Sequence, residues 1–207
     1  MKFILLVEGY TEKNSMREFL KRWLDLRLKT RIGIAIDRFE GWPSFWKKAP
    51  KKAQKYLDGP NGEDILAVIG LLDLYGPSYP PEKTDAESRN EWGVAEIERR
   101  VGREKFRMFF AVHECEAWIL SQPGLLPFNP PNQELRRMQN PERVNFNEPP
   151  SKLLNRLYKS NCREAYKKTV HGAGLFRKLD PNEAYEKCPH FKSMLDEMLS
   201  LARQAGF

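Results

Sequence analysis

Acidic residues after apolar stretches are the feature of this sequence that most suggests chemistry. Three continuous apolar stretches each lead directly, or within a few residues, to a carboxylate. These carboxylates are Glu8, Asp73, Glu114 and Glu116. If each stretch is a strand of one parallel sheet, the acids gather at the edge where ligands of open α/β folds bind. Carboxylates at such short range repel one another unless a cation compensates their charge.

The type of donor predicts the type of cation. Carboxylate oxygens are hard ligands, and no His or Cys cluster accompanies them in the sequence, so the pattern favours Mg²⁺ or Mn²⁺ over Zn²⁺. Magnesium commonly bridges a few carboxylates to the phosphates of a substrate. The chemistry predicted is hydrolysis or transfer of a phosphodiester, in which one or two ions activate a water and stabilise the leaving oxygen.

Each acid alone also has an ordinary structural explanation. A carboxylate at a strand end is most often a helix cap or a loop residue, and Asp73 could simply open a turn. The coincidence at three strand ends favours a shared site over three unrelated caps.

Further candidates lie beside the acids and in the C-terminal third. His113 could orient a carboxylate or donate to a phosphate, although a core histidine is an equal alternative. A group of cationic side chains could clamp phosphates near the acidic edge, or could form solvated helix faces. The group consists of Lys152, Arg156, Lys167, Lys168 and His171.

Two other clusters are less favoured as sites. Cys162, His171, Cys188 and His190 match no zinc-ligand spacing. A run of lysines near three aromatic residues could contact nucleic acid through charge and stacking, but a solvated helix anchored by core aromatic residues is the favoured interpretation. The run consists of Lys47, Lys48, Lys51, Lys52 and Lys55, with Trp42, Phe45 and Trp46 nearby.

Alternating strand and helix patterns predict an α/β fold that positions the acids. The expected strands are 3–7, 31–36, 64–73 and 105–112. Helical periodicity separates them, which argues for a mainly parallel four-stranded sheet with right-handed crossovers and helices on both faces. The expected helices are 11–28 with Thr11 as N-cap, 43–57 with an interruption near Pro50, and 91–102.

The composition changes near residue 123, where a segment with seven prolines begins. Helical patterns follow at 151–168, 181–187 and 189–203. We therefore predict an α/β core at 1–122 and a loop-rich, helical C-terminal appendage at 123–207 that packs on the core. Eleven Lys or Arg residues stand against six Asp or Glu residues in 151–207, so the appendage carries most of the net positive charge.

Overall composition sets the cellular context that we expect. The 207 residues carry a net charge of +7, which permits a polyanionic partner without demonstrating one. Three cysteines without a CxxC pair fit reduced thiols. No apolar run approaches the roughly 20 residues of a membrane span, and no signal-peptide pattern opens the chain, so we expect a cytoplasmic protein.

Six short motifs resemble those of a Toprim-related bacterial family catalogued as domain of unknown function 4276. They are VEGYTE at 7–12, LLDLYG at 71–76, HECEAWILS at 113–121, EPPSKLL at 148–154, AYKKTVHG at 165–172 and CPHF at 188–191. The resemblance therefore covers nearly the whole chain. It implies a Toprim-like, Rossmann-like fold, the metal-binding module of topoisomerases, primases and overcoming-lysogenization-defect nucleases.

The resemblance also implies roles for individual residues. Glu8 matches the Toprim glutamate that acts as general acid or base or as a metal ligand, and Asp73 matches the first aspartate of the Asp-x-Asp motif. Tyr75 stands where the second aspartate would be. Glu114 and Glu116 could supply the missing charge.

Two functional hypotheses follow. The first is a metal-dependent nuclease acting on DNA or RNA, which the resemblance associates with a partner ATPase and a defence system. The second is a non-catalytic module that binds nucleic acid or a nucleotide, or regulates a partner ATPase. Both predict that the four acids converge on one sheet edge. For the first, we also expect 151–172 to fold back so that some of its cationic groups face that edge, namely Lys152, Arg156, Lys167 and His171.

Overall fold

A four-stranded, all-parallel sheet forms the centre of the protein, as the sequence predicted. The computed structural model describes residues 1–129, 135, 138–143 and 148–207, with only the backbone described for 10–14. The strand order is β2-β1-β3-β4. The strands are β1 (Lys2–Val7), β2 (Gly33–Arg38), β3 (Ile65–Asp73) and β4 (Phe106–Ala111).

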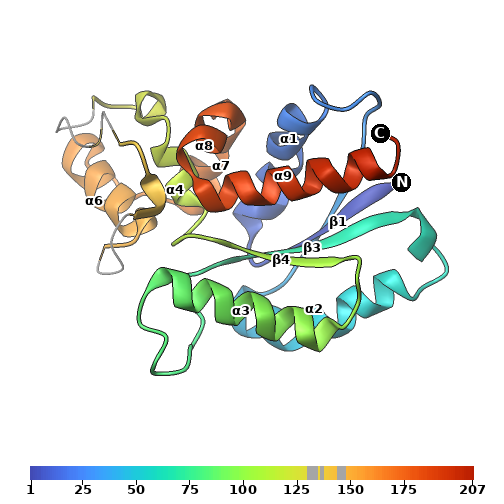
Figure 1. Ribbon diagram of the computed structural model, residues 1–207. Helices are drawn as coiled ribbons and strands as arrows, with labels where there is room; N and C mark the ends of the chain where they lie inside the picture. Colours follow the sequence, from blue (N-terminus) through green and yellow to red (C-terminus); the bar gives the residue numbers. More distant parts are fainter. Residues whose placement is uncertain (130–134, 136–137, 144–147) are drawn as a thin grey trace.

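Helices cover both faces of this sheet (Figure 1), so the α/β prediction is confirmed. Helices α2 and α3 lie on one face, and α1 and α9 lie on the other, while α4 and α6 lie beyond the carboxyl ends of the strands. The helices of the N-terminal part are α1 (Tyr10–Leu24), α2 (Gly41–Leu57), α3 (Ala86–Val101) and α4 (Glu116–Leu120). Those of the C-terminal part are α6 (Pro150–Cys162), the π-helix η4 (Lys168–Gly172), α7 (Ala173–Lys178), α8 (Pro181–Lys187) and α9 (Pro189–Gln204). Short 3₁₀ turns occupy η1 (Gly62–Asp64), η2 (Pro123–Leu125) and η3 (Pro141–Arg143).

Strand β1 shows how the sequence pattern builds two cores. Successive side chains of a strand point to opposite faces of its sheet. Phe3, Leu5 and Val7 accordingly join the cluster beneath α1 and α9, whereas Ile4 and Leu6 join the cluster beneath α2 and α3. A strand buried on both faces has to be continuously apolar, which is the pattern that identified it in the sequence.

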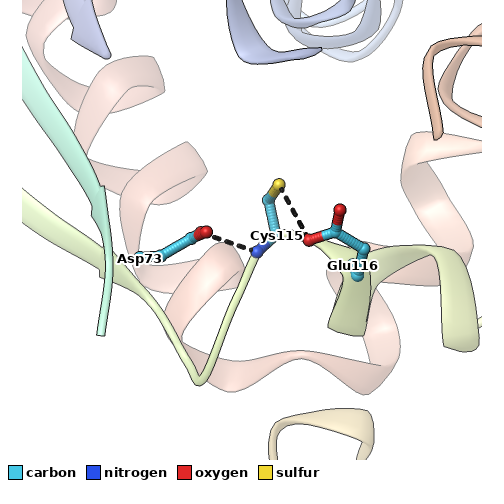
Figure 2. Close-up of side chains that lie close together, drawn as sticks. All are labelled: Asp73, Cys115 and Glu116. Atoms are coloured by element: carbon cyan, nitrogen blue, oxygen red, sulfur yellow. Dashed lines mark hydrogen bonds between the residues drawn. The ribbon is translucent and has the colours of Figure 1, made fainter. Parts of the chain in front are cut away.

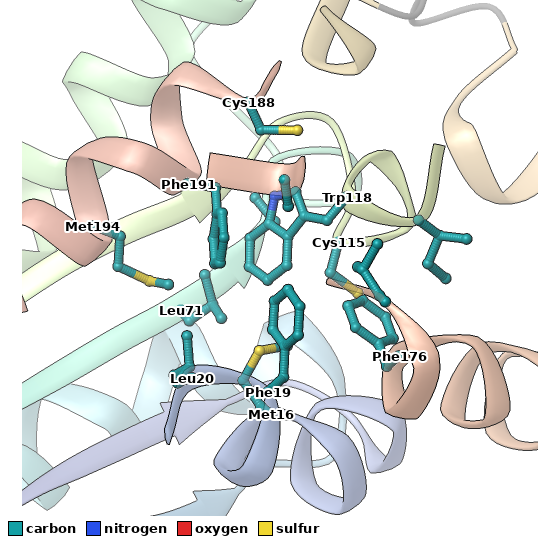
Figure 3. Packing of buried hydrophobic residues seen from close by; sticks show 14 of the residues in the cluster. Met16, Phe19, Leu20, Leu71, Cys115, Trp118, Phe176, Cys188, Phe191 and Met194 are labelled. Carbon is teal, nitrogen blue, oxygen red and sulfur yellow. The ribbon is translucent and has the colours of Figure 1, made fainter. Parts of the chain in front are cut away.

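Aromatic rings join the C-terminal helices to α1 and α4 (Figure 3). Phe191 of α9 lies 4.3 Å from Trp118 of α4 and 5.4 Å from Phe19 of α1, measured between ring centroids. Phe176 of α7 packs on the same rings, 5.5 Å from Phe19. Residues of 1–122 and of 123–207 thus share one core, and the predicted division between these ranges stays a prediction.

Several local predictions were wrong, among them the end of α1, at Leu24 and not at 28, and the start of α3, at Ala86 and not at 91. Helix α1 begins at Tyr10 with Gly9 at the N-cap position, so Thr11 lies inside the first turn. Helix α2 runs through Pro50 without ending. Proline lacks an N–H, so the helix loses one backbone hydrogen bond there, but packing of its apolar face stabilises it by more than this loss costs. The helix predicted at 151–168 ends at Cys162, since Arg163 adopts a left-handed backbone conformation with φ of 58°.

Within the described parts of the chain, no helix combines the length and the apolar character that crossing a membrane requires.

Candidate functional site

The carboxyl ends of β3 and β4 meet in a cluster of acidic side chains. Asp73 is the last residue of β3, and the chain leaving β4 passes through Glu114 and Cys115 into α4, which begins at Glu116. The Cys115 backbone N–H donates a hydrogen bond of 2.9 Å to Oδ1 of Asp73 (Figure 2). This bond fixes the start of α4 against the end of the neighbouring strand.

Glu116 is the most deeply buried member of the cluster, with none of its side chain exposed. The Cys115 thiol donates to its Oε2 over 3.6 Å, and the Tyr166 hydroxyl donates to its Oε1 over 3.5 Å. One ligand atom each from Asp73, Cys115 and Glu116 lies within 4.8 Å of the others. Burial raises the pKa of the Tyr166 hydroxyl, and the Glu116 carboxylate raises it further, so this tyrosine remains a neutral donor at physiological pH.

Glu114 is held by the first turn of α6. The backbone N–H of Ser151 donates to Oε2 of Glu114 over 2.7 Å, and the Ser151 hydroxyl donates to Oε1 over 2.8 Å. The first N–H groups of a helix lack partners within the helix, and its positive end favours an anion. Glu114 therefore caps α6 although it lies 37 residues earlier in the chain.

Lys168, the first residue of the π-helix η4, places its ammonium among all three carboxylates. The Nζ atom lies 3.0 Å from Oε2 of Glu116, 3.3 Å from Oε1 of Glu114 and 3.5 Å from Oδ2 of Asp73. Burial lowers the pKa of this ammonium, but the Asp73, Glu116 and Glu114 charges outweigh that effect and raise the pKa above its ordinary value. Lys168 thus stays protonated, and three negative charges surround one positive charge.

Glu8 lies at the same edge, next to this cluster. Its backbone carbonyl accepts a hydrogen bond of 3.4 Å from the Gly41 N–H at the start of α2, and its side chain is partly exposed. Burial raises the pKa of the nearby Tyr79 hydroxyl; Arg89 opposes this shift, and the Asp73 and Glu8 carboxylates add to it. The charges of Glu8 and Asp73 therefore act on the same region, although Glu8 does not belong to the close group of Asp73, Cys115 and Glu116.

The predicted cationic residues are distributed differently from the acids. Lys152 lies at the edge, where its Nζ donates to the Tyr75 hydroxyl over 3.2 Å. Arg156 instead forms an exposed ion pair with Glu148, with Nε 2.6 Å from Oε1. The structure thus directs Lys152 toward the edge motif LLDLYG and pairs Arg156 with an acid of its own segment.

Residues 167–172 fold back toward the acids, and of the three cationic candidates in this segment it is Lys168 that contacts them. Lys167 is exposed, and its backbone N–H donates to Nδ1 of His171 over 3.0 Å. The His171 ring stacks on Tyr158 with 4.8 Å between centroids, and its Nε2 lies 3.7 Å from Glu164. Lys168 is the residue of this segment that reaches the carboxylates.

His113 is buried, with 4% of its surface exposed. Burial lowers its pKa, Glu114 raises it, and Arg89 and His190 lower it further, so the imidazole is neutral at pH 7. Its carbonyl accepts a hydrogen bond of 2.8 Å from the Tyr75 N–H. These surroundings favour the interpretation of a core histidine, and a catalytic role for it stays a prediction.

Sequence reasoning missed several members of this site. It gave Lys168 no role distinct from that of Lys167, treated Cys115 only as a free thiol, and assigned nothing to Ser151 or Tyr166. A signal existed in the motifs EPPSKLL and AYKKTVHG, which contain Ser151, Tyr166 and Lys168. Nothing in either motif indicates which of its polar residues meets which acid.

The donor set fits a small, hard divalent cation. Asp73, Glu114 and Glu116 offer carboxylate oxygens around one position, and that position already holds a positive charge in the form of the Lys168 ammonium. The Cys115 thiol is a softer ligand, and here it serves as a donor to Glu116. The same arrangement could also coordinate no ion and simply hold the lysine.

Comparison with known proteins gives one match. The model of a family described as Domain of unknown function (DUF4276) matches residues 7–199. No curated protein and no solved structure matches the chain.

Proposed function

We propose that this chain, which belongs to the family described as Domain of unknown function (DUF4276), is a divalent-metal-dependent nuclease that cleaves phosphodiester bonds. The observation that supports it is the convergence of Asp73, Glu114 and Glu116 on one cation position at the carboxyl edge of a parallel sheet. This edge is where open α/β folds bind ligands.

The residues that would hold Mg²⁺ or Mn²⁺ are Asp73, Glu114 and Glu116. A bound ion of this kind polarises a phosphate oxygen and lowers the pKa of a water in its coordination shell. In this proposal Glu8, partly exposed beside the cluster, orients a water or accepts its proton. Lys168 and Lys152 supply cationic donors for phosphate oxygens at the same edge.

A relationship to Toprim domains is part of the proposal. It is supported by the order of the motifs VEGYTE, LLDLYG and HECEAWILS, and by the parallel sheet whose strands end in their acids. Tyr75 replaces the second aspartate of the Toprim pattern, and Glu114 and Glu116 provide carboxylates close to Asp73. By the same resemblance we propose that the protein works with a partner ATPase, and its composition leads us to propose a cytoplasmic location.

A second candidate function is supported by Lys168 itself. Its ammonium already occupies the position among the three carboxylates that an ion would take. Together with Tyr75, this favours a non-catalytic module that binds nucleic acid or a nucleotide, or that regulates a partner ATPase, as the alternative.

The experiment that tests the enzyme is divalent-dependent cleavage by the purified chain and by two nearly isosteric variants. Asp73→Asn removes a charge from the cation position, and Glu8→Gln removes the base. Loss of a general base typically costs about 10²–10⁴-fold in rate. We expect Mg²⁺- or Mn²⁺-dependent cleavage of DNA or RNA, measured with and without a candidate partner ATPase, and we expect both variants to lose it.

Asp58→Asn is the matched control, because Asp58 is an exposed aspartate paired with Arg103 and follows α2 at the opposite end of β3. It should cleave as well as the wild type. Calorimetric titration with Mg²⁺ and Mn²⁺ separates the two candidate functions. A wild type that binds neither ion and cleaves nothing under any of these conditions would exclude the nuclease and leave the non-catalytic module.

A further inference from the structure

Four lysines lie on one face of helix α2. Lys48, Lys51, Lys52 and Lys55 follow the spacing i, i+3, i+4, i+7, which places side chains along a single stripe of an α-helix. We call these four residues the lysine face. Together with Arg38 and Ser44 they line a hollow of about 510 Å³ beside β2.

The rest of α2 explains why these lysines point away from the core. Phe45, Ala49 and Ala53 are fully buried beneath the helix, so the lysine face has to lie on another side. Strand β2 is an outer strand of the sheet, which leaves the hollow open beside it. Lys47 is exposed as well but does not line the hollow.

Basic side chains outnumber acidic ones around this hollow, which is lined by Asp37 and Glu40 as well as by the four lysines and Arg38. Lys52 forms an ion pair with Asp37 at 2.8 Å. Among the described residues, Lys48, Lys51 and Lys55 lie within ion-pair distance of no acid. Like charges three or four residues apart destabilise a helix by about 0.2–0.5 kcal/mol per pair. An anion bound along the stripe would relieve this repulsion.

The hollow leads to the acidic edge. At one end it is bounded by Phe39 and Glu40, which connect β2 to α2. Two hydrogen bonds tie this connection to the end of β1. The Phe39 N–H donates to the Val7 carbonyl over 2.9 Å, and the Gly41 N–H donates to the Glu8 carbonyl over 3.4 Å. Glu8 therefore lies beside the first residue of α2, seven residues before Lys48 at the start of the lysine face.

We propose that the lysine face of α2 binds the phosphate backbone of nucleic acid and directs it toward the acidic edge. Lys48 and Lys55 are seven residues apart, which corresponds to about 10 Å along a helix, enough for more than one phosphate of an extended strand. The choice of nucleic acid as the partner rests on the proposed nuclease function. The surface itself requires only a chain of phosphates.

The experiment measures binding without cleavage. A short, fluorescently labelled single-stranded DNA is titrated with protein in EDTA, and anisotropy is followed at salt concentrations between about 50 and 200 mM. Lys51→Glu should weaken binding several-fold at low salt. It should also reduce the slope of log K against log salt by about 0.7, the value for one phosphate contact on a single strand.

Lys47→Glu is the matched control, since it makes the same charge change on the same helix outside the hollow, and it should leave the slope unchanged. Circular dichroism melts confirm that both variants fold. Equal weakening by both variants would overturn the proposal, as would lysine-dependent binding of anionic lipid vesicles without binding of DNA or RNA. If the protein cleaves nothing but its binding of DNA depends on Lys51, the lysine face binds nucleic acid and the proposed nuclease function is wrong. If the protein cleaves nucleic acid and Lys51→Glu leaves binding unaltered, the nuclease function holds and the proposal for the lysine face is wrong.

Discussion

At the scale of single residues, Lys168 determines the charge of the site. Its ammonium supplies one positive charge among three carboxylates that lie 3.0–3.5 Å from its Nζ and would otherwise repel one another more strongly. The sequence argument instead predicted Mg²⁺ or Mn²⁺ as the cation, which stays a prediction. A divalent ion bound at the same position would compete with this lysine. The two cations therefore exclude each other at full occupancy.

Lys168→Met should produce opposite effects on stability and on metal affinity. Removing one partner of a fully buried ion pair costs about 3–5 kcal/mol, and the cost here should be smaller because 38% of the lysine side chain is exposed to screening solvent. Affinity for Mn²⁺ should rise, because the acids lose their internal counterion. Thermal melts with and without Mn²⁺ measure the first effect, and calorimetric titration measures the second.

Lys167→Met is the control for this prediction, since Lys167 is the exposed neighbour that touches none of the three acids. It should change neither the melting temperature nor the affinity for Mn²⁺ appreciably. Equal behaviour of the two variants would contradict the role given to Lys168.

The acids were predictable from the sequence, and their counterion was not. Glu8, Asp73 and Glu114 follow apolar strands, and parallel strands bring their carboxyl ends to one edge whatever the details of the loops. Lys168 lies 95 residues after Asp73, at the start of a π-helix that follows an irregular segment. Helical periodicity does not distinguish Lys168 from Lys167 there, because neither lies in a regular α-helix.

At the scale of secondary-structure elements, glutamates distant in sequence anchor the N-termini of two helices. Glu114 accepts hydrogen bonds from Ser151 at the start of α6. Glu142 does the same for α9, accepting from the backbone N–H groups of His190 at 2.8 Å and Phe191 at 3.2 Å. Both helices begin with a proline, which lacks an N–H and leaves the following donors for the carboxylate.

Glu142 should make stability depend on pH. Burial raises its pKa from 4.5 to about 7, although the two N–H donors oppose the shift. The folded state therefore keeps a proton that the unfolded chain releases near pH 4.5. The stabilisation by Glu142 is present below pH 4.5 and lost as pH rises to about 7, by up to about 1.4 kcal/mol per pH unit. The difference in unfolding free energy between wild type and Glu142→Gln, measured in urea, should fall across this window.

Glu148→Gln is a control for which stability should depend on pH in the opposite direction. The hydrogen bond from Arg156 lowers the pKa of Glu148, so the small contribution of Glu148 to the unfolding free energy is present above pH 4.5 and lost below it. If the difference in unfolding free energy between wild type and Glu142→Gln stayed constant from pH 4.5 to 7, Glu142 would not titrate in this way.

The bounds of strands and helices were predicted best where the apolar pattern of the segment itself determines them. The bounds of β1, β3 and β4 lie within a residue of those expected, because buried strands are short apolar runs. Strand β2 begins two residues late, at Gly33, since the outer strand is less buried and its pattern weaker. Helix α6 ends at Cys162, before the predicted residue 168, because its end depends on the left-handed conformation of Arg163 and not on periodicity.

At the scale of the whole molecule, the rings around Phe191 join segments far apart in sequence. Phe191→Ala should destabilise the protein by about 3–5 kcal/mol, as expected for truncating a buried phenylalanine. Each kcal/mol lowers the melting temperature of a chain of this size by about 2–4 °C. Because 1–122 and 123–207 share this core, calorimetry should show one transition, shifted to lower temperature in the variant.

Leu26→Ala is the corresponding surface control. Leu26 is 79% exposed, so its truncation should change stability by no more than about 0.5 kcal/mol. Two separate transitions in the wild type would contradict the shared core and would instead favour independent folding of the two ranges.

The order of the site residues along the chain has a consequence for protein synthesis. The ribosome adds Asp73, Glu114 and Glu116 well before it adds Lys168. Ser151, Tyr166 and Lys168, which contact Glu114 and Glu116 in the folded protein, all come later in the chain. Until residues 151–168 have all been synthesised, these two carboxylates lack one or more of those partners. The acidic cluster is therefore completed only after translation has passed Lys168.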